Sequence, residues 1–220
     1  MENNDIYQYI DHTLLKATAT KAQIKQLCLE AQQYGTASVC IPPAFVKWAR
    51  EQFPSLNICT VIGFPLGYNT AEIKAMETAD AVKNGADEID MVINLGLVKD
   101  GLFEQVLEEI RTVRRACKGK ILKVIIETCY LTEEEKIKLC QIVTESGADF
   151  IKTSTGFGTD GAAIEDIELF KTHIGGNVKM KAAGGVKTKA DLEMFIEAGC
   201  KRIGTSSAVK LLSEKQGEGY

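Results

Sequence analysis

Two lysines and one aspartate lie inside short apolar runs of this sequence, where ionisable side chains are uncommon. Lys152 lies in DFIKTSTGF, Lys181 in NVKMKAA and Asp90 in DEIDMVIN. A buried lysine is costly unless it is paired or neutral. An amine whose pKa is lowered by desolvation and by a second cation can attack a carbonyl carbon and form a Schiff base. We therefore expect Lys152 to be the nucleophile, Lys181 to be that second cation, and Asp90 to relay protons through a water.

The same three residues also fit a purely structural interpretation. A salt bridge between Lys152 and Asp90 would only tie strands together, and Lys181 would then pair with another carboxylate or with a substrate charge. The choice between the two interpretations depends on where the fold places these side chains.

The pattern of the whole chain predicts repeated βα units. Short apolar runs rich in Val and Ile alternate with longer charged segments of helical period, which is typical of a parallel sheet covered by helices. Eight such units favour one closed (β/α)₈ TIM barrel of class α/β over residues 1–220, with a flexible tail from about residue 213. The expected strands are 7–13, 37–41, 57–63, 87–94, 121–127, 149–154, 177–183 and 201–206. The expected helices include 20–34, 70–84, 102–117, 132–146 and 188–198.

A weak internal repeat brings the candidate residues to one level. YGTASVC, NGADEID, SGADFIK and AGCKRIG each place a glycine at an expected helix end, where a left-handed residue is needed, and a strand after it. On strands two, four, six and eight, the residues five positions beyond these glycines are Cys40, Asp90, Lys152 and Gly204. Inward side chains of alternate barrel strands form common layers, so these positions should face one another. Strand alternation also turns Lys123, Asp11 and Thr13 inward.

Three segments rich in glycine and hydroxyl groups follow the last three expected strands. They are TSTGFG at 153–158, AAGGVK at 182–187 and GTSSA at 204–208. Each segment alone is most simply a tight turn. Together they follow strands six to eight, where barrels commonly hold phosphate with backbone N–H groups and a helix N-terminus. Gly184 and Gly185 would allow close backbone approach, and Ser206 and Ser207 would donate to the anion.

Composition and charge exclude several classes of function. A net charge of −4 and a pI near 5.4 leave no basic surface for nucleic acid. No window approaches the roughly 18 apolar residues of a membrane span, and the N-terminus does not resemble a signal peptide. The seven cysteines include no Cys-x-x-Cys pair, which suits a reducing, cytoplasmic compartment. His12 and His173 are the only histidines and show no ligand spacing, so we expect no metal and no other cofactor.

A series of motifs from residue 10 to residue 208 resembles the 2-deoxyribose-5-phosphate aldolase family. In order, the motifs are IDHTLLK, CIPPAFV, GADEIDMVINLG, LKVIIETCYLT, GADFIKTSTGF, KAAGGVKT and RIGTSSA. The resemblance implies metal-free, reversible cleavage of 2-deoxy-D-ribose 5-phosphate to D-glyceraldehyde 3-phosphate and acetaldehyde. It also implies that Lys152 forms the Schiff base, while Asp90 and Lys181 handle protons and tune the amine.

The resemblance implies roles for further residues. The family's phosphate contacts match Gly156, Gly184, Gly185, Gly204, Ser206 and Ser207, and its other pocket residues match Asp11, Thr13, Cys40 and Lys123. Phe157 stands where some relatives have lysine, and Lys187 is a candidate replacement cation. A terminal tyrosine of relatives can assist proton transfer at the enamine carbon, which implies that role for Tyr220, although composition alone indicates a mobile tail without function. Barrels of this kind usually self-associate, so we expect a homodimer.

Two other functions fit the same residues. A transaldolase-like Schiff-base aldolase would act on a longer ketose phosphate, and release of acetaldehyde would distinguish the two enzymes. A non-catalytic barrel that binds sugar phosphates would use Lys152 and Lys181 only as partners for an anion. Borohydride trapping would identify that barrel, because a purely electrostatic lysine leaves no covalent adduct.

Overall fold

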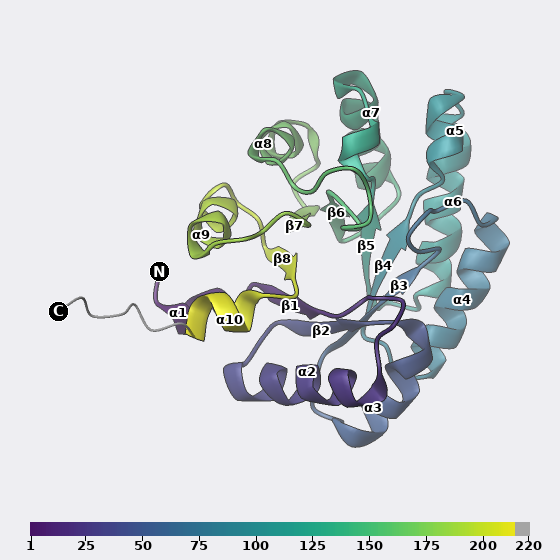
Figure 1. The fold of residues 1–220 in the computed structure, drawn as a ribbon. Coiled ribbons are helices and arrows are strands. Elements are labelled where there is room, and N and C mark those ends of the chain that lie inside the picture. The colour runs from purple at the N-terminus through teal and green to yellow at the C-terminus, as the bar shows by residue number, and fades with distance from the viewer. Residues whose placement is uncertain (214–220) are drawn as a thin grey trace.

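The computed structural model describes residues 1–213 of the chain, and Tyr220 lies outside the described residues. Within them, eight parallel strands close into a barrel in the order β1 to β8, with β8 paired to β1 (Figure 1). The strands are β1 (Ile10–Thr13), β2 (Ser38–Ile41), β3 (Ile58–Ile62), β4 (Glu88–Val92), β5 (Ile121–Ile125), β6 (Phe150–Lys152), β7 (Lys179–Ala183) and β8 (Arg202–Thr205). The predicted (β/α)₈ TIM barrel is confirmed.

Helices connect the strands and surround the barrel (Figure 1). They are α1 (Asn3–Tyr7), α2 (Lys21–Tyr34), α3 (Val46–Gln52), α4 (Ala71–Lys83), α5 (Leu95–Lys99), α6 (Phe103–Ala116), α7 (Glu133–Glu145), α8 (Ile164–His173), α9 (Lys189–Glu197) and α10 (Ala208–Ser213), with short 3₁₀ turns at Pro43–Phe45 and Thr128–Tyr130. Thr20, Thr132 and Thr188 cap three of them, and each cap is closed by the side chain three residues on. None of the helices within residues 1–213 is both long and apolar enough to cross a membrane.

The first strand is shorter than the sequence predicted. The expected strand 7–13 begins inside α1, because Tyr7 ends that helix and its ring stacks on Tyr34 at 4.9 Å between centroids. Pairing with β8 starts only at Ile10. The four glycines of the internal repeat all have positive φ angles, as their places at helix ends require: Gly35, Gly85, Gly147 and Gly199.

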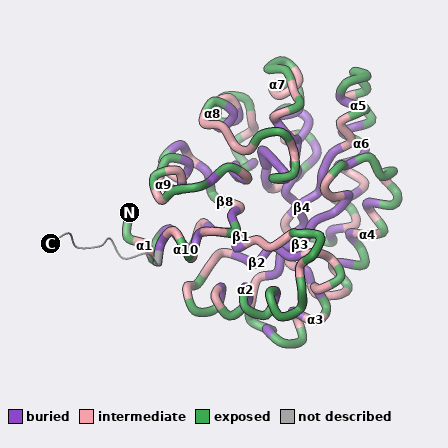
Figure 2. The backbone as a smooth tube through the Cα atoms, viewed as in Figure 1, coloured by how far each residue is buried: buried purple, intermediate pink, exposed green. Residues whose placement is uncertain are grey.

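The strands separate an apolar outer layer from a charged interior. Outward side chains such as Ile89 and Met91 are fully buried and belong to one core cluster with apolar residues of the helices. Figure 2 shows buried residues along the strands and exposed residues on the outer sides of the helices. Inside the barrel, Cys40, Cys59 and Val61 form a second, small apolar cluster. The rest of the interior is available to the ionisable side chains.

Candidate active site

Lys152, Asp90 and Lys181 meet inside the barrel. The Nζ of Lys152 lies 2.8 Å from Oδ2 of Asp90, and the Nζ of Lys181 lies 2.7 Å from the same oxygen. Lys152 and Lys181 are register partners on β6 and β7, so their side chains leave neighbouring strands at one level. Lys152 is 3% exposed, while Asp90 and Lys181 are fully buried. The three residues therefore share one carboxylate oxygen.

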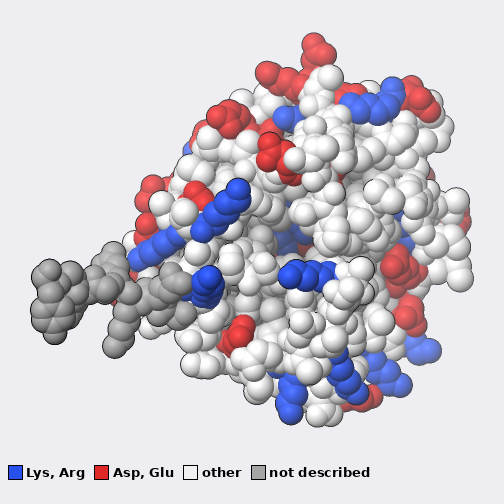
Figure 3. Space-filling view, viewed as in Figure 1, with Lys and Arg blue, Asp and Glu red and all other residues white. Residues whose placement is uncertain are grey.

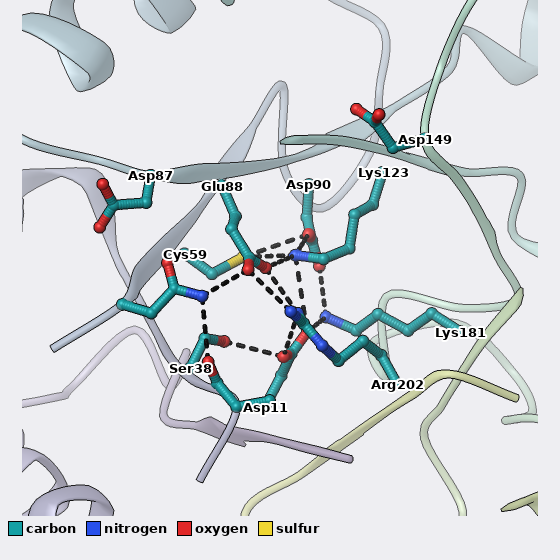
Figure 4. A network of polar contacts seen from close by, with 12 residues as sticks. Asp11, Ser38, Cys59, Asp87, Glu88, Asp90, Lys123, Asp149, Lys181 and Arg202 are labelled. Atoms are coloured by element: carbon teal, nitrogen blue, oxygen red, sulfur yellow. Dashed lines mark hydrogen bonds and ion pairs between the residues drawn. The ribbon is translucent and has the colours of Figure 1, made fainter. Parts of the chain in front are cut away.

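Asp90 and Lys181 belong to a larger ion network, as Figure 4 shows. The Nζ of Lys123 lies 2.8 Å from Oδ1 of Asp90 and 3.5 Å from Oδ2 of Asp11. Lys181 also pairs with Asp11. One guanidinium nitrogen of Arg202 lies 3.0 Å from Oδ1 of Asp11 and 2.7 Å from Oε2 of Glu88. Residues from five strands are thereby linked across the interior.

The network favours the charged forms of Asp90 and Lys181. Burial raises the pKa of Asp90, but Lys123, Lys152 and Lys181 outweigh burial and bring that pKa well below its usual value. Burial lowers the pKa of Lys181, whereas Asp11 and Asp90 raise it, and the carboxylates prevail. The sequence interpretation required a second cation beside Lys152, and Lys181 is held as one.

A cavity of about 280 Å³ opens at the carboxyl ends of β1, β6, β7 and β8. The amine-bearing side chain of Lys152 forms part of its wall. The expected binding residues that line it are Thr13, Gly156, Gly184, Gly185, Gly204, Ser206 and Ser207. The other lining residues are Leu14, Leu15, Lys16, Thr155, Phe157, Ala183, Val186 and Thr205. The cavity therefore brings the nucleophile candidate and the three glycine and hydroxyl segments together.

Three of the expected binding residues do not reach this cavity. Asp11 and Lys123 are fully buried in the ion network, and Cys40 is 1% exposed beside Asp90. Inward side chains of a barrel stack in layers, so residues nearer the amino ends of the strands lie below those at the carboxyl ends. These three residues lie beside Asp90 or Lys181 rather than in the cavity wall.

Buried cysteine and carboxylate atoms also come close enough to suggest a metal site. The ligand atoms of Cys40, Cys59 and Asp90 lie within 4.8 Å of one another. Asp90, however, already accepts contacts from Lys123, Lys152 and Lys181. A divalent cation there would face the ammonium groups of Lys123 and Lys181 at close range, so the residues fit an ion network better than a metal.

The sequence pattern of the DeoC/LacD family of aldolases matches residues 6–213. The chain belongs to this family. It is 58% identical over 221 residues to the deoxyribose-phosphate aldolase of Clostridium botulinum strain Alaska E43, with all of both chains covered. It is 56% identical to the deoxyribose-phosphate aldolase of Clostridioides difficile strain 630, covering 98% of this chain and 99% of the relative.

Solved structures agree with the family assignment. An aldolase called QR15 superposes with a TM-score of 0.92 at 40% identity, covering 96% of this chain and 95% of its own. A deoxyribose phosphate aldolase from Aeropyrum pernix, described as a unique tetramer, gives a TM-score of 0.89 at 32% identity and covers 96% of this chain and 91% of its own. The barrel is thus the fold of this aldolase family.

Gly161, which the sequence interpretation did not include, packs against the turn at Gly184 and Gly185. Both glycines have positive φ angles, and within the described residues their backbone N–H groups donate no hydrogen bond. Gly161 packs directly against them, since a Cβ there would lie 2.5 Å from the carbonyl carbon of Gly184. The N–H of Ala162 donates to the carbonyls of Ala183 and Gly184 at 3.1 and 3.2 Å. The turn therefore presents free donors from a fixed backbone.

Phe157 and Lys187 occupy different places. Phe157 lines the cavity, and its ring meets the edge of Phe64 with centroids 5.3 Å apart. Lys187 does not line the cavity, and its backbone N–H donates to Asp191 at 2.8 Å. The candidate replacement cation therefore lies outside the cavity wall.

Glu88 and Arg202 are also missing from the expected site. Glu88 stands two residues before Asp90, and Arg202 two residues before Gly204, so strand alternation turns both inward. Their spacing of two residues from Asp90 and Gly204 could have identified them as inward-facing from the sequence alone. They complete the charge balance of the interior, because Arg202 contacts both Glu88 and Asp11.

Proposed function

We propose that this family member is a Schiff-base aldolase that reversibly cleaves 2-deoxy-D-ribose 5-phosphate to D-glyceraldehyde 3-phosphate and acetaldehyde, without a metal or other cofactor. The observation that carries the proposal is the position of Lys152, whose side chain forms cavity wall while its amine contacts Asp90 at 2.8 Å. The two relatives named deoxyribose-phosphate aldolase match the chain over nearly its whole length, which supports the same substrate.

The ion pairs of the interior balance one another without Lys152. Without Lys152, three carboxylates (Asp11, Glu88 and Asp90) face three cations (Lys123, Lys181 and Arg202). The nucleophilic form of Lys152, the neutral amine, therefore leaves the buried network without net charge.

The reaction begins when the neutral amine of Lys152 attacks C1 of the open-chain sugar. The carbinolamine takes up a proton on its oxygen and loses water, which leaves a protonated imine. Loss of the proton from the C3 hydroxyl then breaks the C2–C3 bond, and the bonding electrons move to the imine as an enamine. D-Glyceraldehyde 3-phosphate leaves. A proton added to C2 regenerates the imine, and water releases acetaldehyde and the free amine.

Asp90 is proposed to carry the protons of these steps through a water. Its Oδ2 is the atom nearest to Lys152, and it also contacts the ammonium of Lys181 at 2.7 Å. A carboxylate with an ammonium partner can pass a proton in either direction as the substrate changes charge. Proton transfer by a positioned group typically contributes about 10²–10⁴-fold to rate.

The glycine and hydroxyl segments are proposed to bind the phosphate group. Gly156, Gly184, Gly185 and Gly204 would let the backbone approach the anion, and Ser206 and Ser207 would donate hydroxyl groups. Thr13 lines the same cavity, and its Oγ1 donates to the Asp11 carbonyl at 2.7 Å. With the phosphate so held, the other end of the sugar is directed at Lys152.

Asp11, Cys40 and Lys123 are proposed to support the site from below. Asp11 and Lys123 keep Lys181 and Asp90 in place through ion pairs. Cys40 fills the interior next to Asp90. Loss of any of the three is therefore expected to act on catalysis through the two charged residues above them.

Tyr220 lies outside the described residues, and its role remains a proposal that rests on the family resemblance. We expect it to assist proton transfer at the enamine carbon. Tyr220→Phe should then slow turnover and slow the exchange of acetaldehyde methyl protons with solvent, with little effect on thermal stability. Unchanged exchange in that variant would leave Asp90, Lys152 and Lys181 as the catalytic set.

We also propose a cytoplasmic homodimer. Seven cysteines without a Cys-x-x-Cys pair suit a reducing compartment. Barrels of this kind usually self-associate, and the Aeropyrum pernix relative is described as a tetramer. Light scattering of the purified chain distinguishes a dimer from a monomer or a tetramer.

The decisive experiment is reduction with borohydride in the presence of acetaldehyde, followed by peptide mass spectrometry. One reduced two-carbon unit should appear on Lys152, and Lys152→Ala should abolish both adduct and activity while the fold persists. An adduct on Lys181 or on surface lysines would overturn the assignment. Absence of any adduct would favour a binding barrel, and cleavage of a longer ketose phosphate without acetaldehyde would favour a transaldolase-like enzyme.

A further inference from the structure

The charge of the cavity wall is unbalanced. Among the residues that line it within the described chain, Lys16 and Lys152 are the cations, and none is a carboxylate. The amine of Lys152 already contacts Asp90 and is needed for the carbonyl carbon of the substrate. Lys16 is therefore the lining cation that no other proposed step uses.

Lys16 stands three residues beyond the end of β1, at the carboxyl ends of the strands. Its carbonyl accepts the N–H of Ala19 at 2.9 Å, which fixes its backbone in a turn, while its side chain is exposed. Lys16 makes no ion pair within 4.0 Å with any residue of the described chain. Figure 3 shows Lys and Arg side chains bordering the hollow on this face of the molecule. The ammonium of Lys16 is thus free to meet an anion in the cavity.

A phosphate dianion in this cavity would otherwise meet mostly neutral donors. Gly184 and Gly185 offer N–H groups, and Ser206 and Ser207 offer hydroxyl groups. The whole chain carries a formal charge of −4, so positive charge must be supplied locally. Hydrogen bonds from a charged donor are roughly twice as strong as those from a neutral one. A single well-placed ammonium would therefore change phosphate affinity measurably.

The other cations considered for this task do not reach the wall. Phe157 lines the cavity but brings an aromatic ring, which is 53% exposed and has no charge. Lys187 is not a lining residue. The hydrogen bond from its backbone N–H lowers the pKa of Asp191, and the charge of its side chain adds to this effect. Lys16 lines the cavity from the loop after β1, the strand that pairs with β8.

We propose that Lys16, rather than Phe157 or Lys187, is the residue that supplies the positive charge binding the phosphate group of the substrate. This inference rests on the proposed function, because it assumes a phosphorylated sugar in the cavity. Lys16 is then a specificity residue: it favours the phosphorylated sugar over the unphosphorylated one and takes no part in the Schiff-base chemistry.

The first test measures binding of inorganic phosphate by calorimetry to the full-length chain. Lys16→Met should raise the Kd about tenfold, a value between those typical of exposed ion pairs and of charge-assisted hydrogen bonds. Lys16→Arg should stay within about twofold of the unmodified chain, because the charge is retained. Lys187→Met is the matched control, a nearby surface lysine that should leave the Kd unchanged. The difference between Lys16→Met and the unmodified chain should shrink at high salt.

The second test compares kcat/KM for 2-deoxy-D-ribose 5-phosphate and for 2-deoxy-D-ribose. Lys16→Met should lower the ratio of the two values about tenfold, chiefly through KM of the phosphorylated sugar. An unchanged phosphate Kd and ratio in Lys16→Met, or a larger effect in Lys187→Met, overturns the proposal. Failure of the proposed function is distinguishable, because it would appear as an unmodified chain that cleaves neither sugar, whereas phosphate binding needs no turnover.

Discussion

One methyl group at position 161 should displace the turn that we assign to the phosphate. A Cβ on Gly161 would lie 2.5 Å from the carbonyl carbon of Gly184, 2.6 Å from its oxygen and 2.7 Å from the nitrogen of Gly185. Ordinary contacts of a Cβ begin at 3.4 Å. In Gly161→Ala the backbone of the turn must therefore move by roughly 0.9 Å, since no flexible side chain is present to yield.

The size of the effect follows from that displacement. Overpacking of this kind costs about 1–3 kcal/mol in the free energy of unfolding. A shift near 1 Å also takes the N–H groups of Gly184 and Gly185 out of hydrogen-bonding range of the anion. One hydrogen bond to a charged group contributes about 1.5–3 kcal/mol, so kcat/KM for 2-deoxy-D-ribose 5-phosphate should fall about ten- to a hundredfold.

The assay compares steady-state kinetics on the phosphorylated and the unphosphorylated sugar, together with unfolding in urea. The loss should be much larger on the phosphorylated sugar, because the turn is proposed to hold the phosphate group and not the carbon that Lys152 attacks. Gly176→Ala is the matched control, since a Cβ at Gly176 meets no atom within 4 Å and its φ angle is not positive. That variant should behave as the unmodified chain.

Two results would refute this reasoning. If Gly161→Ala kept the substrate preference of the unmodified chain, the turn would not bind phosphate or would tolerate the shift. If both sugars were affected equally, the damage would lie in the barrel as a whole rather than in the turn.

Four further predictions follow from the ion network and the cavity. Lys123→Met should lower the free energy of unfolding by about 3–5 kcal/mol because it leaves a carboxylate uncompensated, and adding Glu88→Gln should recover part of the loss, whereas strict additivity in urea unfolding would contradict the charge count. Ser207→Glu should impair the phosphorylated sugar far more than 2-deoxyribose, because a carboxylate repels phosphate, and equal losses would remove Ser207 from the site. EDTA should leave activity unchanged, and a loss that a divalent cation restores would count against the metal-free mechanism. Burial lowers the pKa of Lys123, but Asp90 and its neighbours raise it well above its usual value. The folded chain therefore keeps this proton above about pH 10.4 while the unfolded chain loses it, so stability should fall as pH rises beyond that value, and less steeply in Lys123→Met.

The barrel and the central contact were predictable because they follow from local rules. Glycine at a helix end and alternation along a strand fixed the register, and that register brought Asp90 to Lys152 across the interior. The same parity would have included Glu88 and Arg202, had the charged interior been treated as a whole.

Other features could not be predicted because they depend on loop paths and on height within the barrel. Gly161 reaches the turn at Gly184 only because the loop after β6 folds back over β7, and no periodicity marks it. Lys16 reaches the cavity, whereas Lys187 does not, for the same reason. Asp11 and Lys123 were expected in the pocket, but a linear sequence does not say which inward layer meets solvent.

Closure of the ring has a consequence for how the chain is made. Asp11 and Arg202 form an ion pair although 191 positions separate them. This pair between the first and last strands, β1 and β8, can therefore form only after nearly the whole barrel has been synthesised. Such distant contacts slow folding, because the loop between them must be ordered before the contact forms. A nascent chain that ends before Arg202 would lack one of the cations that pair with Asp11 and Glu88, so the charges of the interior would not balance. Partial products of translation should therefore stay open and be sensitive to proteases, and the amine of Lys152 would acquire its surroundings only when synthesis is nearly finished.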